Sequence, residues 1–242
     1  MMAVILAGGK GTRLRPFTMA IPKPLLPLGD VPIIEVVLQQ LANAGVHRIV
    51  ITLGHMAHLF VASIGDGFRF GINIEYCTEN SPLGTAGSLR LISDPEEHML
   101  VMNGDILTTL DYVKLLNHHI EVGASATIAV HRREAKIDYG VVETTPGGQL
   151  YRYVEKPVIP YVVSMGINII SQRALEFIPL QSRFDMPQLM QTLVNTGHTV
   201  ECYESDCYWQ DIGRFDDYQQ ASADFSANPD RFLDHPYLTS RG

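Results

Sequence analysis

An α/β fold, with a mostly parallel sheet covered by helices, is the architecture that this 242-residue sequence predicts. In the first half, apolar segments typical of strands alternate with segments of helical periodicity, an order that favours parallel strands joined by helices. In the second half, strand segments follow one another, with a hairpin turn at Pro146-Gly147-Gly148. With 46% hydrophobic and 18% charged residues, the chain suits one globular domain with a sizeable core.

The alternation in the first half rests on apolar runs that are each followed by a turn or cap signal. Pro32 suits the first turn of a helix that Gly45 ends, and Asp111 is typical of a helix N-cap. The predicted strands span residues 4–7, 47–53, 72–76 and 98–102, and the predicted helices span 31–44, 55–64, 88–92 and 111–121.

The second half, residues 123–225, completes a single domain with residues 1–122 and is predicted to be richer in strands. Its predicted strands span residues 124–130, 140–143, 150–154, 163–170 and 199–203, and its predicted helices span 171–177, 186–195 and 214–225. The tail, residues 226–242, carries two prolines and few periodic apolar residues. We therefore expect it to be packed down or partly disordered.

Composition excludes several classes of function. The formal net charge of −8 argues against a nucleic-acid partner, since a phosphate backbone requires a basic stripe. The three cysteines, Cys77, Cys202 and Cys207, lack zinc-site spacing and are expected to be reduced thiols of a cytoplasmic protein. The first apolar run reaches glycine after about six residues, which is too short for a signal peptide or a membrane span.

The most informative stretch follows the first predicted strand. Glycines at positions 8, 9 and 11 tolerate backbone angles that let consecutive amide N–H groups converge on one anion. Arg13 brings a positive charge to this loop, and Pro22 and Pro24 fix the backbone on both sides of Lys23. A tight turn without a ligand would explain one or two glycines, but not this combination. The loop matches neither a dinucleotide fingerprint nor a P-loop, so the pattern indicates a different kind of phosphate site.

A second polar loop spans residues 78–87 and contains the small residues Gly84, Thr85 and Gly87. These would let a flat ring lie against the backbone, while the carboxylate of Glu79 could accept hydrogen bonds from the edge of a nucleobase. An ordinary helix start capped by Thr85 is the alternative.

An aspartate follows the predicted strand 98–102 in the string Asn103-Gly104-Asp105. A side chain just past the carboxyl end of a parallel strand points into the ligand crevice of an open α/β sheet. A carboxylate oxygen is the ligand that Mg²⁺ prefers when it bridges to phosphates. Asp105 is therefore a candidate magnesium ligand.

The two loops together resemble a known family, the sugar-1-phosphate nucleotidylyltransferases. These enzymes join a nucleoside triphosphate to a sugar 1-phosphate and release pyrophosphate. The resemblance lies in Leu6-Ala7-Gly8-Gly9-x-Gly11-Thr12-Arg13-Leu14-x-Pro16, Pro22-Lys23-Pro24-Leu25 and Pro82-Leu83-Gly84-Thr85-Ala86-Gly87. It continues in Tyr139-Gly140-Val141-Val142, Glu155-Lys156-Pro157, Gly166-Ile167-Asn168 and Trp209-x-Asp211-x-Gly213.

The resemblance implies a Rossmann-like sheet of the nucleotide-diphospho-sugar transferase type, with an added β-rich region for the sugar. It implies catalytic roles for Arg13 and Lys23 and metal-binding roles for Asp105 and Asp211. Residues implied to bind the nucleotide are Leu6, Ala7, Gly8, Gly9, Gly11, Thr12, Glu79, Pro82, Gly84 and Thr85. Residues implied to bind the sugar phosphate are Gly140, Glu155, Lys156 and Asn168.

This set of residues suggests a mechanism in which the protein supplies positive charge and aligns the two substrates. Both are needed because the triphosphate and the sugar phosphate are anions that must approach one another. We expect Arg13 and the glycine-loop amides to hold the β- and γ-phosphates and the departing pyrophosphate. Lys23 would lie at the α-phosphate or the attacking oxygen, and Asp105 and Asp211 would hold Mg²⁺. No general base is needed, because the sugar phosphate oxygen is already ionised at neutral pH.

Several alternatives remain open from the sequence. The motifs look most like guanylyltransferases acting on mannose or heptose 1-phosphate, while uridylyl- and thymidylyltransferases acting on a hexose 1-phosphate are the alternative. A non-catalytic nucleotide-sugar-binding subunit would be expected to have lost charged residues that are all present here. A glycosyltransferase would usually show an Asp-x-Asp motif in place of Asn103-Gly104-Asp105. The sequence does not define the oligomeric state, and a homo-oligomer is compatible with it.

Overall fold

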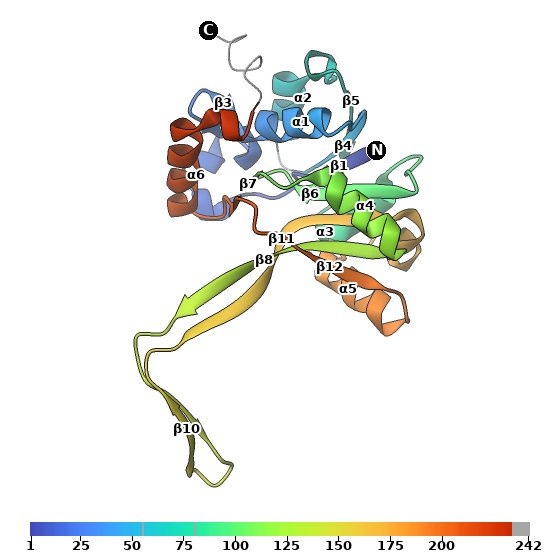
Figure 1. Ribbon diagram of the computed structural model, residues 1–242. Coiled ribbons are helices and arrows are strands. Elements are labelled where there is room, and N and C mark those ends of the chain that lie inside the picture. Colours follow the sequence, from blue (N-terminus) through green and yellow to red (C-terminus); the bar gives the residue numbers. More distant parts are fainter. Residues whose placement is uncertain (55, 80, 234–242) are drawn as a thin grey trace.

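A seven-stranded sheet forms the centre of the molecule in the computed structural model, which describes residues 1–54, 56–79 and 81–233 (Figure 1). The strands follow the order β12-β8-β11-β6-β1-β4-β5. Their bounds are β1 Met2–Leu6, β4 Arg48–Leu53, β5 Asn73–Thr78, β6 His98–Asn103, β8 Ala126–Lys136, β11 Val158–Ser171 and β12 Val200–Glu204.

The sheet is mostly parallel, as predicted. Strands β1, β4, β5 and β6 pair in parallel, and β12 pairs in parallel with β8. The exception is β11, which runs antiparallel to both of its neighbours, β6 and β8. Because β1, β4 and β6 share one direction, the loops that follow them meet at one edge, where ligands bind in open α/β sheets.

Helices cover both faces of the sheet, as predicted. Their bounds are α1 Ile33–Asn43, α2 Ala57–Ile64, α3 Gly84–Gly87, α4 Tyr112–Val122, α5 Met186–Asn195 and α6 Phe215–Ala227. Helices α1, α2 and α4 bury apolar side chains against one face, and α3 and α5 against the other. Helix α6 packs against the outer side of α1 in a third cluster.

The start of α4 agrees with the cap residue predicted from the sequence, whereas α2 and α3 begin at other residues than predicted. Asp111 is the N-cap of α4 and accepts a hydrogen bond from the backbone N–H of Lys114 at 3.0 Å. The helix predicted over 88–92 begins earlier, with α3, and continues only as a 3₁₀ turn over Ser88–Leu91. The helix predicted over 55–64 is α2, which begins at Ala57, and residue 55 lies outside the described residues.

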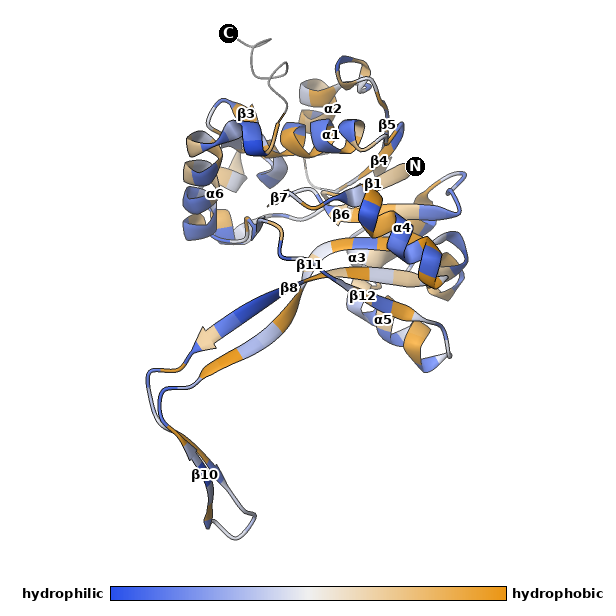
Figure 2. Cartoon of the chain, viewed as in Figure 1, coloured by the Kyte–Doolittle hydropathy of each residue, from blue (hydrophilic) through white to orange (hydrophobic). Residues whose placement is uncertain are grey.

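A long β-arm is the main departure from the predicted elements (Figure 1). Strands β8 and β11 pair beyond the sheet, from Val130 opposite Ser164 to Lys136 opposite Val158. They carry at their far end a hairpin of β9, Val141–Thr144, and β10, Leu150–Val154. Figure 2 shows hydrophobic residues along β11 both in the sheet and in the arm. The strands exceed their predicted lengths because continued mutual pairing satisfies their backbone groups.

Two short antiparallel pairs lie outside the main sheet and were not predicted. Strand β7, Ile106–Thr108, pairs with β13, Trp209–Asp211, and β2, Pro27–Leu28, pairs with β3, Val31–Pro32. Strands of two or three residues contain no periodicity that a sequence pattern can reveal.

The predicted tail is partly packed. Residues 226 and 227 end α6, and Phe232 and Leu233 are buried in the third cluster. Residues 234–242 lie outside the described residues. Among the helices described, none combines the length and apolar character needed to span a membrane.

A buried histidine joins α4 to the sheet at the edge opposite the glycine loop. His119 lies 2.8 Å through Nδ1 from the Thr127 hydroxyl and 3.0 Å through Nε2 from the Ser171 hydroxyl. Its Nε2 is also 3.2 Å from Nδ1 of His98. Burial, followed by the neighbouring His98 and His118, lowers the pKa of His119 to about 4.

This histidine is predicted to make stability depend on pH. In the unfolded chain an imidazole takes up a proton near pH 6.5, whereas the folded protein resists protonation until about pH 4. The contribution of neutral His119 to the free energy of unfolding is therefore fully present above about pH 6.5. It decreases by on the order of 3 kcal/mol as the pH falls toward 4. Urea unfolding across this range should show a smaller loss for His119→Gln than for the wild type. The control, His58→Gln at an exposed histidine of α2, should behave as the wild type.

Candidate active site

The glycine loop begins where β1 ends and is held by close backbone packing. The backbone N–H of Ala7 donates to the carbonyl of Thr52 at 3.0 Å. A Cβ atom at Gly54 would lie 2.9 Å from the carbonyl oxygen of Gly8, so this contact requires glycine. Gly11 has a φ of +57°, and its carbonyl accepts a hydrogen bond from the Thr18 hydroxyl at 2.8 Å. The loop is therefore fixed before any ligand binds.

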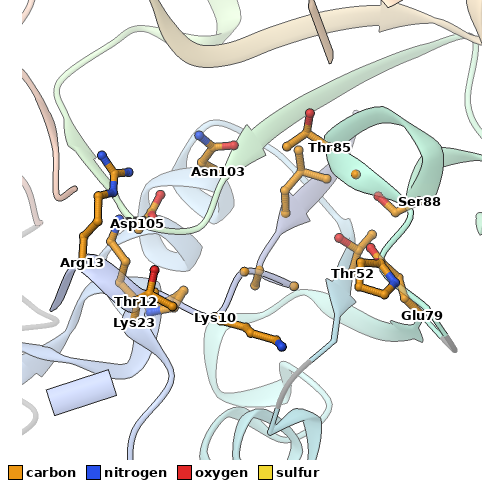
Figure 3. Close-up of a pocket in the computed structure, with 18 of the residues that line it drawn as sticks. Lys10, Thr12, Arg13, Lys23, Thr52, Glu79, Thr85, Ser88, Asn103 and Asp105 are labelled. Atoms are coloured by element: carbon orange, nitrogen blue, oxygen red, sulfur yellow. Dashed lines mark ion pairs between the residues drawn. The ribbon is translucent and has the colours of Figure 1, made fainter. Parts of the chain in front are cut away.

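A cavity of about 520 Å³ opens above this loop (Figure 3). Figure 3 shows Arg13, Lys23 and Asp105 gathered on one side, and Glu79, Thr85 and Ser88 on the other. The cavity is lined by Leu6, Ala7, Gly8, Gly9, Lys10, Gly11, Thr12, Arg13, Lys23, Pro24, Thr52, Glu79, Pro82, Gly84, Thr85, Ser88, Asn103, Asp105 and Arg183. This set includes every residue predicted to bind the nucleotide, both predicted catalytic residues and one predicted metal ligand.

Lys23 forms an ion pair with Asp105. Lys23 is only 8% exposed and begins a 3₁₀ turn, Lys23–Leu25, that follows Pro22. Asp105 is brought close because the backbone N–H of Gly104 donates to the carbonyl of Leu6 at 3.1 Å. A Cβ at Gly104 would lie 3.0 Å from the Ile5 side chain, so glycine allows this tight approach. A lysine on the first loop and an aspartate from the turn after β6 thus meet at one point.

The second predicted metal ligand, Asp211, lies beside Asp105. Strand β13 pairs with β7 so that Asp211 is opposite Ile106, and the N–H of Ile212 donates to the carbonyl of Asp105 at 3.2 Å. Asp211 keeps an exposed surface, yet desolvation by the surrounding protein raises its pKa. The negative charge of Asp105 raises the pKa further, while Lys23 and Arg13 oppose the increase.

Arg13 also reaches this point from the glycine loop. A Cβ atom built at Gly213 would lie 3.5 Å from two guanidinium nitrogens of Arg13 and 3.3 Å from a carboxylate oxygen of Asp211. The guanidinium and the carboxylate are therefore close to the same point. Arg13, Lys23, Asp105 and Asp211 therefore form one cluster of alternating charge.

The cluster fits a divalent cation. The like charges of Asp105 and Asp211 raise the pKa of Asp211, and a cation between the carboxylates would relieve this repulsion. In the described part of the chain, no group of three or more histidine, cysteine or acidic side chains could hold a metal. The protein would then supply two carboxylates, and phosphate oxygens and water would complete the coordination, as is usual for Mg²⁺.

The loop at the other side of the cavity is fixed by the start of α5. Gly84 has a φ of +78°, and a Cβ there would lie 2.6 Å from a carboxylate oxygen of Asp185. The same carboxylate accepts the N–H of Thr85 at 3.1 Å, and the Thr85 hydroxyl accepts the N–H of Met186 at 2.7 Å. Glu79 accepts the N–H of Leu83 at 2.9 Å through one oxygen.

Sequence reasoning missed several residues at this site. Arg183 lines the cavity, and Asp185 holds its loop, though only the helix after them was predicted. An aspartate directly before a helix was the available signal for Asp185. Thr52 and Ser88 line the cavity without any motif that would reveal them.

The predicted sugar-phosphate residues divide between two places. Asn168 on β11 is buried and lines a second cavity next to the first. Gly140, Glu155 and Lys156 lie on the arm, where the Tyr153 hydroxyl donates to Glu155 at 3.2 Å, and they line neither cavity. The structure therefore does not bring all four to one cavity, because the pairing of β8 with β11 carries the hairpin away from the sheet.

Comparisons with known proteins agree with this geometry. A family model described as nucleotidyl transferase matches residues 2–228. The UTP--glucose-1-phosphate uridylyltransferase of Synechocystis sp. is 35% identical over 91% of this chain and 62% of its own length. The mannose-1-phosphate guanylyltransferase of Mycobacterium tuberculosis is 31% identical over 92% of this chain and 64% of its own length. The chain therefore spans about three-fifths of the length of these relatives.

Solved structures give the same result for the fold. HddC from Yersinia pseudotuberculosis superposes with a TM-score of 0.71 and 26% identity, covering 93% of this chain and 99% of that one. A glucose-1-phosphate thymidylyltransferase from Bacillus anthracis, described as putative, superposes with a TM-score of 0.74 at 24% identity, covering 92% of this chain and 94% of that one. The chain belongs to the nucleotidyl transferase family, among the sugar-1-phosphate nucleotidylyltransferases.

Proposed function

We propose that this chain transfers a nucleotidyl group from a nucleoside triphosphate to a sugar 1-phosphate and releases pyrophosphate. The observation that carries the proposal is one cavity with a fixed glycine loop and a charge cluster at one side and the Glu79 loop at the other. In this proposal, residues 1–122 hold the nucleotide and residues 123–225 hold the sugar phosphate. The free cysteines suit a reducing compartment, so we assign the reaction to the cytoplasm.

Charge and alignment are the catalytic contributions of the protein. Arg13 and the glycine-loop amides bind the β- and γ-phosphates and stabilise the leaving pyrophosphate. Lys23 lies at the α-phosphate, where it reduces the repulsion between the triphosphate and the incoming phosphate. The attacking oxygen is already ionised at neutral pH, so the protein needs only to hold it in line with the bond that breaks.

Mg²⁺ is the cofactor that this proposal includes. Asp105 and Asp211 would hold it, and when bound it would neutralise charge on the phosphates. The ion pair with Lys23 keeps Asp105 in place while no metal is bound.

The arm would complete the sugar-phosphate site by bending toward the cleft. The register of β11 is irregular between Ser164 and Asn168, and Gly166 within it has a φ of +72°. The roles that we propose, Lys156 at the sugar phosphate and Glu155 with Gly140 at the sugar hydroxyls, require the arm to bend at this point. Asn168 lies on the sheet side of this point and would contact the sugar without any movement.

GTP with mannose or heptose 1-phosphate is the substrate pair that we propose first. The Glu79 carboxylate could accept hydrogen bonds from two donors of guanine, and a relative in Mycobacterium tuberculosis is named a mannose-1-phosphate guanylyltransferase. UTP or dTTP with a hexose 1-phosphate is the alternative, in line with the name of the Synechocystis relative.

The direct test is pyrophosphate release by the purified protein with Mg²⁺ and paired substrates. GTP, UTP, dTTP, CTP and ATP are each combined with mannose, glucose, glucosamine, N-acetylglucosamine and heptose 1-phosphates. Turnover that requires both substrates supports the proposal and identifies the base and the sugar. Nucleotide binding without turnover in any combination would instead favour a non-catalytic, regulatory role.

Replacing Lys23 by alanine should slow turnover by about 10² to 10³-fold, because a prearranged cation at the reacting phosphates is lost. The matched control is Lys114→Ala, which removes an exposed lysine that pairs with Asp111 on α4. Steady-state rates of both variants are compared after thermal unfolding has shown that each is folded. A Lys23→Ala rate close to that of the wild type would contradict the role assigned to this lysine.

Removing the Asp211 carboxylate should weaken Mg²⁺ binding by at least about 10-fold. Calorimetric titration of Mg²⁺ with a non-hydrolysable nucleoside triphosphate present would compare Asp211→Asn with Asp216→Asn, an exposed aspartate on α6. Since the pKa of Asp211 is raised, acidification should weaken Mg²⁺ binding to the wild type at a higher pH than for an ordinary aspartate. Equal Mg²⁺ affinities in the two variants would rule out Asp211 as a ligand.

A further inference from the structure

Trp209 lies between the arm and the charge cluster of the first cavity. It is the only tryptophan of the chain and the first residue of β13, which ends with Asp211. Its indole N–H donates to the backbone carbonyl of Met165 at 3.0 Å. Met165 belongs to the irregular stretch of β11 at which the arm leaves the sheet. The side chain of Trp209 is therefore attached to the point at which the arm would bend.

Arg133 contacts the same tryptophan from the arm. It lies on β8 opposite Tyr161, on the side of the irregular stretch that points away from the sheet. Its guanidinium carbon is 5.1 Å from the centroid of the Trp209 ring, and its Nη2 donates to the Trp209 carbonyl at 3.3 Å. A cation above an indole ring is attracted by the ring face. One arginine of the arm thus holds both the side chain and the backbone of Trp209.

Strand β13 connects Trp209 to the charge cluster. It has three residues, and its pairing with β7 places Trp209 opposite Thr108 and Asp211 opposite Ile106. Residues two apart in an extended strand lie on the same face and are separated by a single residue. A displacement of Trp209 is therefore passed on to Asp211, beside Asp105.

We propose that Arg133 is a positioning residue that couples the arm to Asp211 through Trp209. The inference rests on the proposed function, in which the arm carries Lys156 to the sugar phosphate and Asp211 holds Mg²⁺. Bending of the arm moves Arg133 relative to Trp209, so this contact transmits the motion to β13. Because the reaction needs the metal and the sugar phosphate at once, metal binding favours the bent arm. By linkage, the bent arm favours metal binding by the same factor.

Hydrogen exchange of the arm tests the coupling with a probe that depends on neither the base nor the sugar. Pyrophosphate is the proposed product with every substrate pair, so the probe is Mg²⁺ with pyrophosphate, and its binding is measured by calorimetry. Exchange of the backbone amides in residues 130–136 and 158–164 is followed by mass spectrometry with and without the probe. In the wild type the probe should slow this exchange by at least about 5-fold, because it favours the bent arm.

Two neighbouring arginines of β8 give a matched pair of variants. Arg133→Gln removes the contact with Trp209 and should reduce the effect of the probe to less than about 2-fold, while the probe still binds. Arg132→Gln is the control, because Arg132 is also exposed on the arm but pairs with Glu204. It should respond as the wild type. Without any ligand, the fluorescence emission of Trp209 should shift in Arg133→Gln and not in Arg132→Gln.

The outcomes separate the two proposals. An equal slowing of exchange in Arg133→Gln, an unchanged emission in that variant, or no slowing in the wild type although the probe binds would overturn the coupling while the proposed function stands. A coupled response in a chain that turns over none of the paired substrates would overturn the proposed reaction and support the coupling. Failure of the probe to bind would overturn both, because Asp211 would then hold no metal.

Discussion

The ion pair between Lys23 and Asp105 is the contact on which the arrangement of the site depends. It joins the loop after β1 to the turn after β6, and Lys23 is almost completely buried. Burying a charged pair usually costs as much desolvation energy as it returns, so such a pair adds little to stability. Its benefit is positional, because it fixes a cation and a carboxylate at the sheet edge where Arg13 and Asp211 also arrive.

Charge is distributed unevenly between the protein and its cleft. The chain has a net charge of −8, yet Lys10, Arg13, Lys23 and Arg183 all line the first cavity. Local cations in an acidic protein attract a small anion without creating a basic surface for nucleic acids. The second cavity next to it is lined by uncharged residues, most of them apolar.

Sequence patterns predicted the features that depend on neighbouring residues. The strands β1, β4 and β6 are buried apolar runs, and the glycine loop needs positive φ at Gly11, so both leave local signals. Strand β13 and the arm depend instead on partners distant in sequence, such as Ile106 opposite Asp211. For the same reason, the sequence showed that Glu155 and Lys156 belong to a motif. It did not show that they lie on an arm away from the cavity, because that depends on the pairing of β8 with β11.

The identity of the products tests the central claim most directly, because it reports which phosphorus atom is attacked. ³¹P NMR of a reaction with triphosphate, sugar 1-phosphate and Mg²⁺ should show pyrophosphate and a sugar nucleotide in equal amounts. Neither product should form when one substrate is omitted. Appearance of nucleoside diphosphate with inorganic phosphate or a sugar bisphosphate would mean attack at the γ-phosphorus and would contradict the proposed function of this cleft.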